Sequence, residues 1–201
     1  MTTDDLLALA PVIPVVVLED ADAAVPLART LVEAGLPAIE ITLRTPAALE
    51  AIANIAADVP EAVVGAGTVV TGAQAQDALA AGARFLVSPG STPALLDALA
   101  GVPFLAGAVT ASEVMALLER GITAAKFFPA ESSGGVPALR ALAGPFPRMR
   151  FCPTGGINAA KAQDYLALPN VACVGGSWML PPPAVKAGDW ERVRELAAAA
   201  S

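Results

Sequence analysis

The sequence contains no histidine, and this absence narrows the chemistry that the chain can perform. Histidine is the commonest zinc ligand in proteins and the usual general base near neutral pH. Catalysis by this chain must therefore depend on lysine, carboxylates, tyrosine or cysteine.

Basic residues are also scarce. The chain has 12 Lys and Arg against 19 Asp and Glu, which gives a net charge of −7. Binding to nucleic acid needs a basic face, so we expect no nucleic-acid partner. Because the net charge is negative, the protein as a whole does not attract anions, and a small anionic ligand would have to be held by groups within its binding site.

The two cysteines, Cys152 and Cys173, lie inside apolar runs, and we expect buried free thiols there instead of a disulfide. The longest uncharged stretch, residues 165–185, is interrupted by glycines and by Pro181 to Pro183, so it predicts no membrane span. Asp4 and Asp5 stand where a secretory signal would carry positive charge, and the expected location is the cytoplasm.

A composition of 55% hydrophobic and 15% charged residues over 201 positions predicts one well-packed domain, residues 1–201. Eight short apolar runs end in turn residues, and their starts are 19 to 26 residues apart. They are Val12–Leu18, Ala38–Leu43, Ala62–Thr68, Phe85–Gly90, Phe104–Val109, Ala124–Ala130, Arg150–Gly156 and Val171–Ser177.

The stretches between these runs are rich in Ala and Leu at helical spacing. Several end in a glycine suited to the position after a helix, namely Gly35, Gly82, Gly101 and Gly121. Strict alternation of eight strands with helices favours an α/β fold, a closed (β/α)₈ TIM barrel, over an open doubly wound sheet. A helix from Asp4 to Ala10 would plug one end, and a last helix would start at Trp190 with Asp189 as its cap.

In this fold the active site lies at the carboxyl ends of the strands. The polar residues inside or just after the runs are Glu40, Thr42, Arg44, Thr68, Ser88, Lys126, Thr154 and Ser177. In the second run Glu40, Thr42 and Arg44 alternate with apolar residues, so we expect the polar side to face the barrel interior. A solvated edge strand would explain the same pattern, but a closed barrel has no edge.

Lys126 lies in the middle of the apolar run AAKFFPA. A lysine is costly to bury without a partner, and burial favours the neutral amine that adds to carbonyl groups. A carboxylate that exchanges protons beside such an amine is what iminium catalysis requires, and Glu40 is the candidate. A buried Lys126–Glu40 ion pair without chemistry is the simpler alternative.

Two glycine pairs follow the last two runs: Gly155 with Gly156, and Gly175 with Gly176 before Ser177. The loops after strands seven and eight of such barrels commonly bind phosphate through backbone N–H groups. Each pair alone is ordinary turn chemistry, but together they predict an anion site.

With these residues identified, the chain resembles the family of 2-keto-3-deoxy-6-phosphogluconate (KDPG) and 4-hydroxy-2-oxoglutarate (KHG) aldolases over nearly its full length. The shared strings include EITLRTP from Glu40, VGAGTV from Val64, KFFPAE from Lys126, RFCPTGGI from Arg150 and GGSW from Gly175.

The resemblance implies a class I aldolase that forms a Schiff base and needs no cofactor. It places the Schiff base on Lys126, acid and base catalysis on Glu40, and the substrate carboxylate on Arg44 and Thr68. It places the phosphate on Gly155, Gly156, Gly176 and Ser177, beside Thr154, and it implies a homotrimer.

Ser91 and Ala106 depart from the residues common in the family, and we expect both to line the mouth of the barrel. Substrate preference among KDPG, its galactonate epimer and KHG is therefore left open. Two other readings also stay open at this point: a lysine that holds pyridoxal phosphate, and a barrel that binds phosphate without catalysis.

Overall fold

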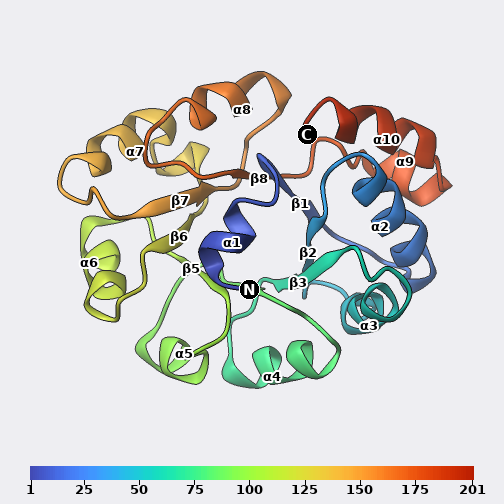
Figure 1. The fold of residues 1–201 in the computed structure, drawn as a ribbon, viewed down its shortest axis with the longest axis horizontal. Helices are drawn as coiled ribbons and strands as arrows, with labels where there is room; N and C mark the ends of the chain where they lie inside the picture. Colours follow the sequence, from blue (N-terminus) through green and yellow to red (C-terminus); the bar gives the residue numbers. More distant parts are fainter.

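The computed structural model describes all residues from 1 to 201 and contains eight parallel strands that alternate with helices (Figure 1). The strands are β1 Val12–Val16, β2 Ala38–Thr42, β3 Val63–Gly67, β4 Leu86–Val87, β5 Phe104–Gly107, β6 Ala124–Phe127, β7 Arg150–Pro153 and β8 Val174–Gly176. Each strand from β1 to β6 pairs with the next in the chain, and β8 pairs with β1. Two bridges, Phe151 with Val171 and Thr154 with Gly175, join β7 to the β8 segment and close the barrel. The predicted TIM barrel is confirmed.

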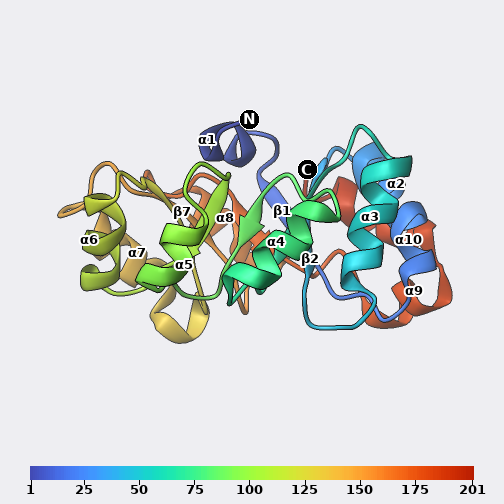
Figure 2. The same cartoon turned by 90° about the horizontal axis from the view of Figure 1, so that it is seen from below.

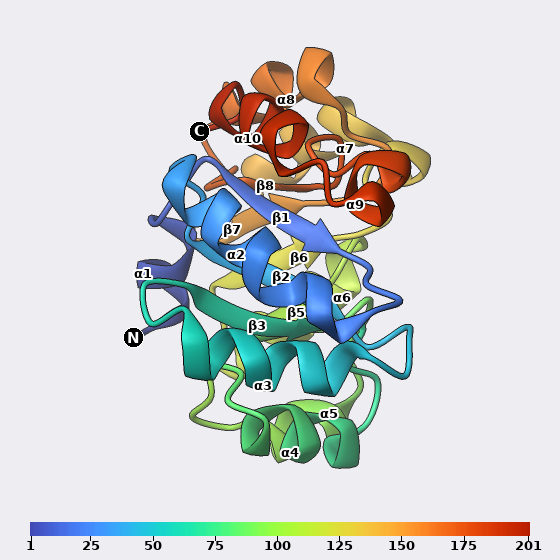
Figure 3. The same ribbon diagram turned by 90° about the vertical axis from the view of Figure 1, so that its right-hand side faces the viewer.

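The helices surround the barrel (Figure 3). They are α1 Thr3–Leu7, α2 Ala24–Glu33, α3 Ala48–Asp58, α4 Gly72–Ala80, α5 Pro93–Ala98, α6 Ala111–Glu119, α7 Gly135–Ala143, α8 Ala159–Leu166, α9 Pro182–Ala187 and α10 Trp190–Ala198, with short 3₁₀ turns η1 Ala21–Ala23 and η2 Glu131–Ser133. Asp189 caps α10, as predicted. All four predicted cap glycines have positive φ, between 73° and 101°, which glycine adopts without a steric penalty. No helix is both long and apolar enough to span a bilayer.

Buried side chains form two clusters, one between strands and helices and one inside the barrel. The alternation of β2 divides its residues between them, because Ile39 and Ile41 pack toward the helices while Ala38 packs inside. The interior is tightly filled around Phe85. A Cβ added at Gly65 would lie 2.5 Å from the Phe85 ring, so the small residue on β3 makes room for the large one.

Helix α1 covers the amino-terminal end of the barrel (Figures 1 and 2). Leu6 and Leu7 belong to the interior cluster, and the Thr3 hydroxyl accepts a hydrogen bond from the Phe104 N–H at 3.3 Å. The helix ends at Leu7, earlier than the predicted Ala10. At Ala10 itself, Pro11 disfavours helical backbone. The helix thus covers one end of the barrel, and the residues predicted for the site lie at the other, at the carboxyl ends of the strands.

Candidate active site

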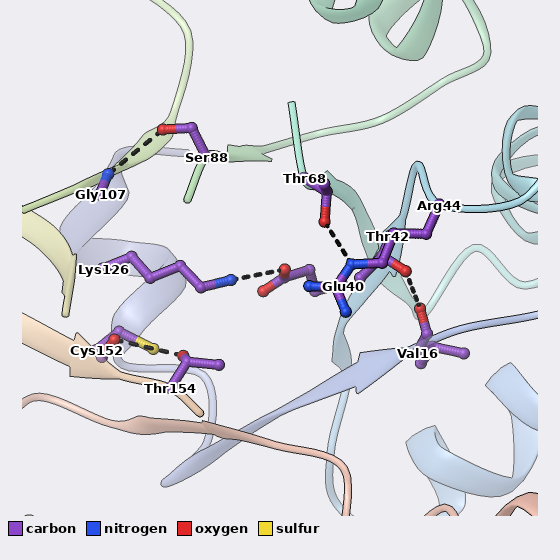
Figure 4. A network of polar contacts seen from close by, with 10 residues as sticks. All are labelled: Val16, Glu40, Thr42, Arg44, Thr68, Ser88, Gly107, Lys126, Cys152 and Thr154. Atoms are coloured by element: carbon purple, nitrogen blue, oxygen red, sulfur yellow. Dashed lines mark hydrogen bonds and ion pairs between the residues drawn. The ribbon is translucent and has the colours of Figure 1, made fainter. Parts of the chain in front are cut away.

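Lys126 and Glu40 meet inside the barrel. Lys126 extends from β6 and Glu40 from β2, and the Lys126 Nζ lies 3.0 Å from the Glu40 Oε1 (Figure 4). The two residues are only 4% and 3% exposed. Because neither charge can be solvated well, each depends on the other for its stability in the interior. The sequence predicted this juxtaposition.

Small residues and an aromatic ring surround Lys126. Its neighbours on the adjacent strands are Gly107 and Cys152, which are both small. The Nζ also lies 5.3 Å from the centre of the Phe128 ring, close enough for a cation–π interaction. An amine held between an aromatic face and a carboxylate is fixed in position, with a proton acceptor within hydrogen-bonding distance.

Gly67 at the end of β3 leaves the space that the Glu40 side chain occupies. A Cβ at this position would lie 2.1 Å from the Glu40 Oε1 and 2.6 Å from its Cγ and Cδ. The glycine therefore determines where the carboxylate can lie.

We expect Gly67→Ala to push the Glu40 carboxylate away from Lys126 and to lower kcat by roughly 10²-fold, since small displacements of catalytic groups are costly. The matched control is Gly90→Ala, because a Cβ at Gly90 meets no atom within 4 Å. Steady-state kinetics on folded protein measure both variants, and equal activity in the two would contradict this role for Gly67.

Arg44 and Thr68 lie together at the mouth. The Arg44 Nε donates a hydrogen bond to the Thr68 Oγ1 at 3.0 Å (Figure 4). The sequence pattern predicts that Arg44 projects into the interior, but β2 ends at Thr42 and Arg44 is exposed at the rim. Thr68 has φ of 60°, which is unusual for a β-branched residue, and such strain is typical of functional sites.

The two glycine loops lie side by side, because Thr154 after β7 forms a bridge with Gly175 of β8. Gly155 and Gly156 have φ of 105° and 78°. Neither of their backbone N–H groups donates a hydrogen bond within the chain, so both are free for an anion.

Close contacts require glycine in the β8 loop as well. A Cβ at Gly175 would lie 2.2 Å from the Thr154 Oγ1, and one at Gly176 would lie 1.8 Å from the Trp178 ring. Ser177 is exposed next to them, whereas Thr154 is buried. The structure thus brings all of the predicted phosphate contacts to one part of the mouth.

Comparison with known proteins identifies the family. The profile of the KDPG and KHG aldolases matches residues 3–196. The chain belongs to this family. A 2-dehydro-3-deoxy-phosphogluconate aldolase from Pseudoalteromonas atlantica is 50% identical over 98% of this chain and 93% of its own length. The KHG/KDPG aldolase of Escherichia coli K12 is 48% identical over the same shares of the two chains.

A solved structure extends the likeness to three dimensions. The KDPG aldolase of Legionella pneumophila, with pyruvate captured as a covalent carbinolamine, is 45% identical, with a TM-score of 0.98. The match covers 100% of this chain and 98% of the other. The family resemblance and the class I aldolase assignment made from the sequence are confirmed.

Other polar residues of this aldolase that the sequence placed at the strand ends support the backbone. The Thr42 hydroxyl donates to the Val16 carbonyl at 3.0 Å, and the Ser88 hydroxyl accepts from the Gly107 N–H at 3.3 Å (Figure 4). Ser91 acts similarly, because its hydroxyl donates to the Gly107 carbonyl at 3.1 Å. Ala106 is fully buried in the cluster between strands and helices, so the prediction that it lines the mouth is wrong.

Proposed function

We propose that this aldolase cleaves KDPG to pyruvate and glyceraldehyde 3-phosphate. The observation that carries the proposal is the buried Lys126–Glu40 pair, 3.0 Å apart, in a barrel whose carboxyl end carries Arg44, Thr68 and the two glycine loops. The relatives that are 48% and 50% identical are named for this substrate. The Legionella enzyme holds pyruvate as a covalent carbinolamine, which is the intermediate that an amine nucleophile would form.

In the proposed mechanism Glu40 accepts a proton from Lys126, and the neutral amine adds to the C2 ketone of the substrate. Glu40 returns this proton to the carbinolamine hydroxyl, which leaves as water and gives an iminium ion with Glu40 again ionised. Glu40 then takes the proton of the C4 hydroxyl, the C3–C4 bond breaks, and its electrons move to the iminium nitrogen. Glyceraldehyde 3-phosphate leaves, and the remaining enamine is protonated at C3 and hydrolysed to pyruvate and free Lys126.

Binding groups at the mouth would fix both ends of the substrate. Arg44 can form a charge-assisted bond to the C1 carboxylate, and Thr68 would contact the same group. The phosphate would be held by the free N–H groups of Gly155 and Gly156 and by Gly176 and Ser177, with Thr154 beside them. Fixing both ends positions the C3–C4 bond next to Glu40.

The experiment that tests the proposal is reduction with borohydride in the presence of pyruvate. We expect a covalent adduct on Lys126 in the peptide map, with Lys161 and Lys186 unmodified as internal controls. Adducts spread over all three lysines, or none at all, would overturn the Schiff base. Activity that survives a chelator, and a spectrum without visible absorbance, would separate this reading from a metal-dependent or pyridoxal-dependent one.

Substrate preference within the family is tested by comparing kcat/KM for KDPG, its galactonate epimer and KHG. KDPG and its epimer are both expected to exceed KHG, because the free N–H groups of the glycine loops suit the phosphate that both carry. A higher value for KHG, which carries a carboxylate at its far end, would overturn the preference and leave the aldolase chemistry intact.

We further propose that the functional unit is a cytoplasmic homotrimer of this single domain, residues 1–201. The support for it is the family membership. Light scattering on the purified protein measures the oligomeric state, and a monomer at micromolar concentration would contradict the trimer.

A further inference from the structure

Glu131 lies behind the Gly155–Gly156 loop, outside the set of residues that the mechanism uses. It follows β6 by four positions and begins the short turn η2. Its backbone N–H donates to the Gly155 carbonyl at 3.1 Å, next to a bond from the Ala130 N–H to the Thr154 carbonyl at 2.8 Å. The segment that carries Lys126 is thus continued as a ladder along the loop after β7.

The Glu131 side chain also packs against this loop. A Cβ added at Gly156 would lie 2.7 Å from the Glu131 Cγ and 2.9 Å from its Cβ. Two consecutive glycines with positive φ have wide conformational freedom, so their shape must be imposed by neighbouring groups. Glu131 supplies both a hydrogen bond to the first glycine and a surface under the second.

Two residues of α8 hold the Glu131 carboxylate in place. The Lys161 Nζ donates to its Oε2, and the Tyr165 hydroxyl donates to its Oε1. The Lys161 ammonium, and after it the Tyr165 hydroxyl, lowers the pKa of Glu131. Burial, followed by the Glu131 carboxylate, raises the pKa of Tyr165. At neutral pH Glu131 is therefore an ionised acceptor, and Tyr165 keeps the proton that it donates.

Tyr165 is the firmer of the two anchors. It is 1% exposed and belongs to the core between strands and helices, whereas the Lys161 side chain is 47% exposed. An exposed ion pair contributes little because water screens it, while a hydrogen bond from a buried hydroxyl to a carboxylate is stronger. The orientation of Glu131 is therefore set mainly by the core through Tyr165.

We propose that Glu131, held by Tyr165, is a positioning residue that presents the free N–H groups of Gly155 and Gly156 to the phosphate of the substrate. This inference rests on the proposed function. It assigns to Glu131 a role in the affinity for the phosphorylated end of the substrate, separate from the chemistry at Lys126. Glu131 would thereby favour substrates that end in a phosphate over those that end in a neutral hydroxyl.

The test compares two substrates and one partial reaction in Glu131→Ala, Glu131→Gln and Tyr165→Phe. The substrates are KDPG and 2-keto-3-deoxygluconate, which lacks the phosphate. The partial reaction is hydrogen–deuterium exchange at the methyl group of pyruvate, which needs Lys126 and no far-end contact. Glu195→Gln is the control, since Glu195 forms an exposed ion pair with Arg192 on α10.

We expect Glu131→Ala to raise KM for KDPG roughly tenfold, with kcat/KM for 2-keto-3-deoxygluconate and the exchange rate within about twofold of the wild type. Glu131→Gln keeps the aliphatic contact and an acceptor for Tyr165, so its KM should be intermediate. Tyr165→Phe should raise KM for KDPG as well, and Glu195→Gln should change nothing.

Equal losses with both substrates, or a parallel loss of exchange, would show a merely structural role and overturn the inference. An unchanged KM for KDPG in all three variants would overturn it too. The nearly isosteric Tyr165→Phe decides the matter if Glu131→Ala does not fold. A wild-type protein that neither exchanges pyruvate protons nor cleaves KDPG would instead contradict the proposed function.

Discussion

Replacing Lys126 with methionine is expected to lower kcat by roughly 10⁴-fold or more, because removing a covalent nucleophile typically has an effect of at least this size. Methionine is close to lysine in shape, so the packing against Phe128 and between Gly107 and Cys152 should survive. Cleavage of KDPG measured by coupled reduction of pyruvate gives the rate, and borohydride reduction with pyruvate should leave no adduct.

The same substitution has a second consequence, which concerns stability. It leaves the Glu40 carboxylate in a position that is 3% exposed without its partner, and breaking a buried ion pair costs about 3–5 kcal/mol. The double variant Lys126→Met with Glu40→Gln removes both charges and should recover most of that loss. Chemical unfolding measures both, and it separates a folded, inactive enzyme from an unfolded one.

These two readouts distinguish an enzyme from a silent ion pair. In the silent case Lys126→Met would lower stability and the double variant would restore it, but neither wild type nor variant would trap pyruvate. Retention of wild-type kcat in a folded Lys126→Met protein would contradict the assignment of the nucleophile.

The catalytic pair could be predicted because each residue breaks a local rule in a way that the fold explains. Lys126 is a charged residue inside an apolar strand. Glu40 lies on β2 in line with Ala38 and Thr42, which occupy alternate positions of the strand. In a closed barrel these positions face inward, so strand alternation alone brings residues 86 positions apart to one site. The site formed by the glycine pairs at β7 and β8 could be predicted as well, because the carboxyl ends of neighbouring strands meet at one end of a barrel.

The supporting contacts could not be predicted, because they depend on register and on the ends of strands. Glu40 pairs with Gly65 in the ladder, yet the glycine that its carboxylate touches is Gly67, one step further along the same face. Arg44 reaches the rim because β2 ends at Thr42. Glu131 ends the shared string KFFPAE, but its role could not be predicted because its two partners, Lys161 and Tyr165, lie 30 and 34 residues away.

Glu40→Gln should lower kcat by about 10²- to 10⁴-fold, the usual contribution of a general acid–base group. The amide keeps the size of the side chain and can still accept a hydrogen bond from Lys126, so the geometry of the pair should persist. What is lost is the ability to take up and return protons. Lys126 should still be trapped by pyruvate and borohydride, but more slowly, since its amine must lose its proton to water.

Deuterium exchange at the methyl group of pyruvate is the sharpest measure of this variant. Exchange requires a base to remove the C3 proton from the iminium ion and an acid to return it, so it should fall together with kcat in Glu40→Gln. If exchange stayed at the wild-type rate while cleavage was lost, Glu40 would act only on the C4 hydroxyl and another group would serve C3. If both rates were unchanged, the carboxylate would serve only to balance the charge of Lys126, and the proton transfers of the reaction would have to be assigned to water.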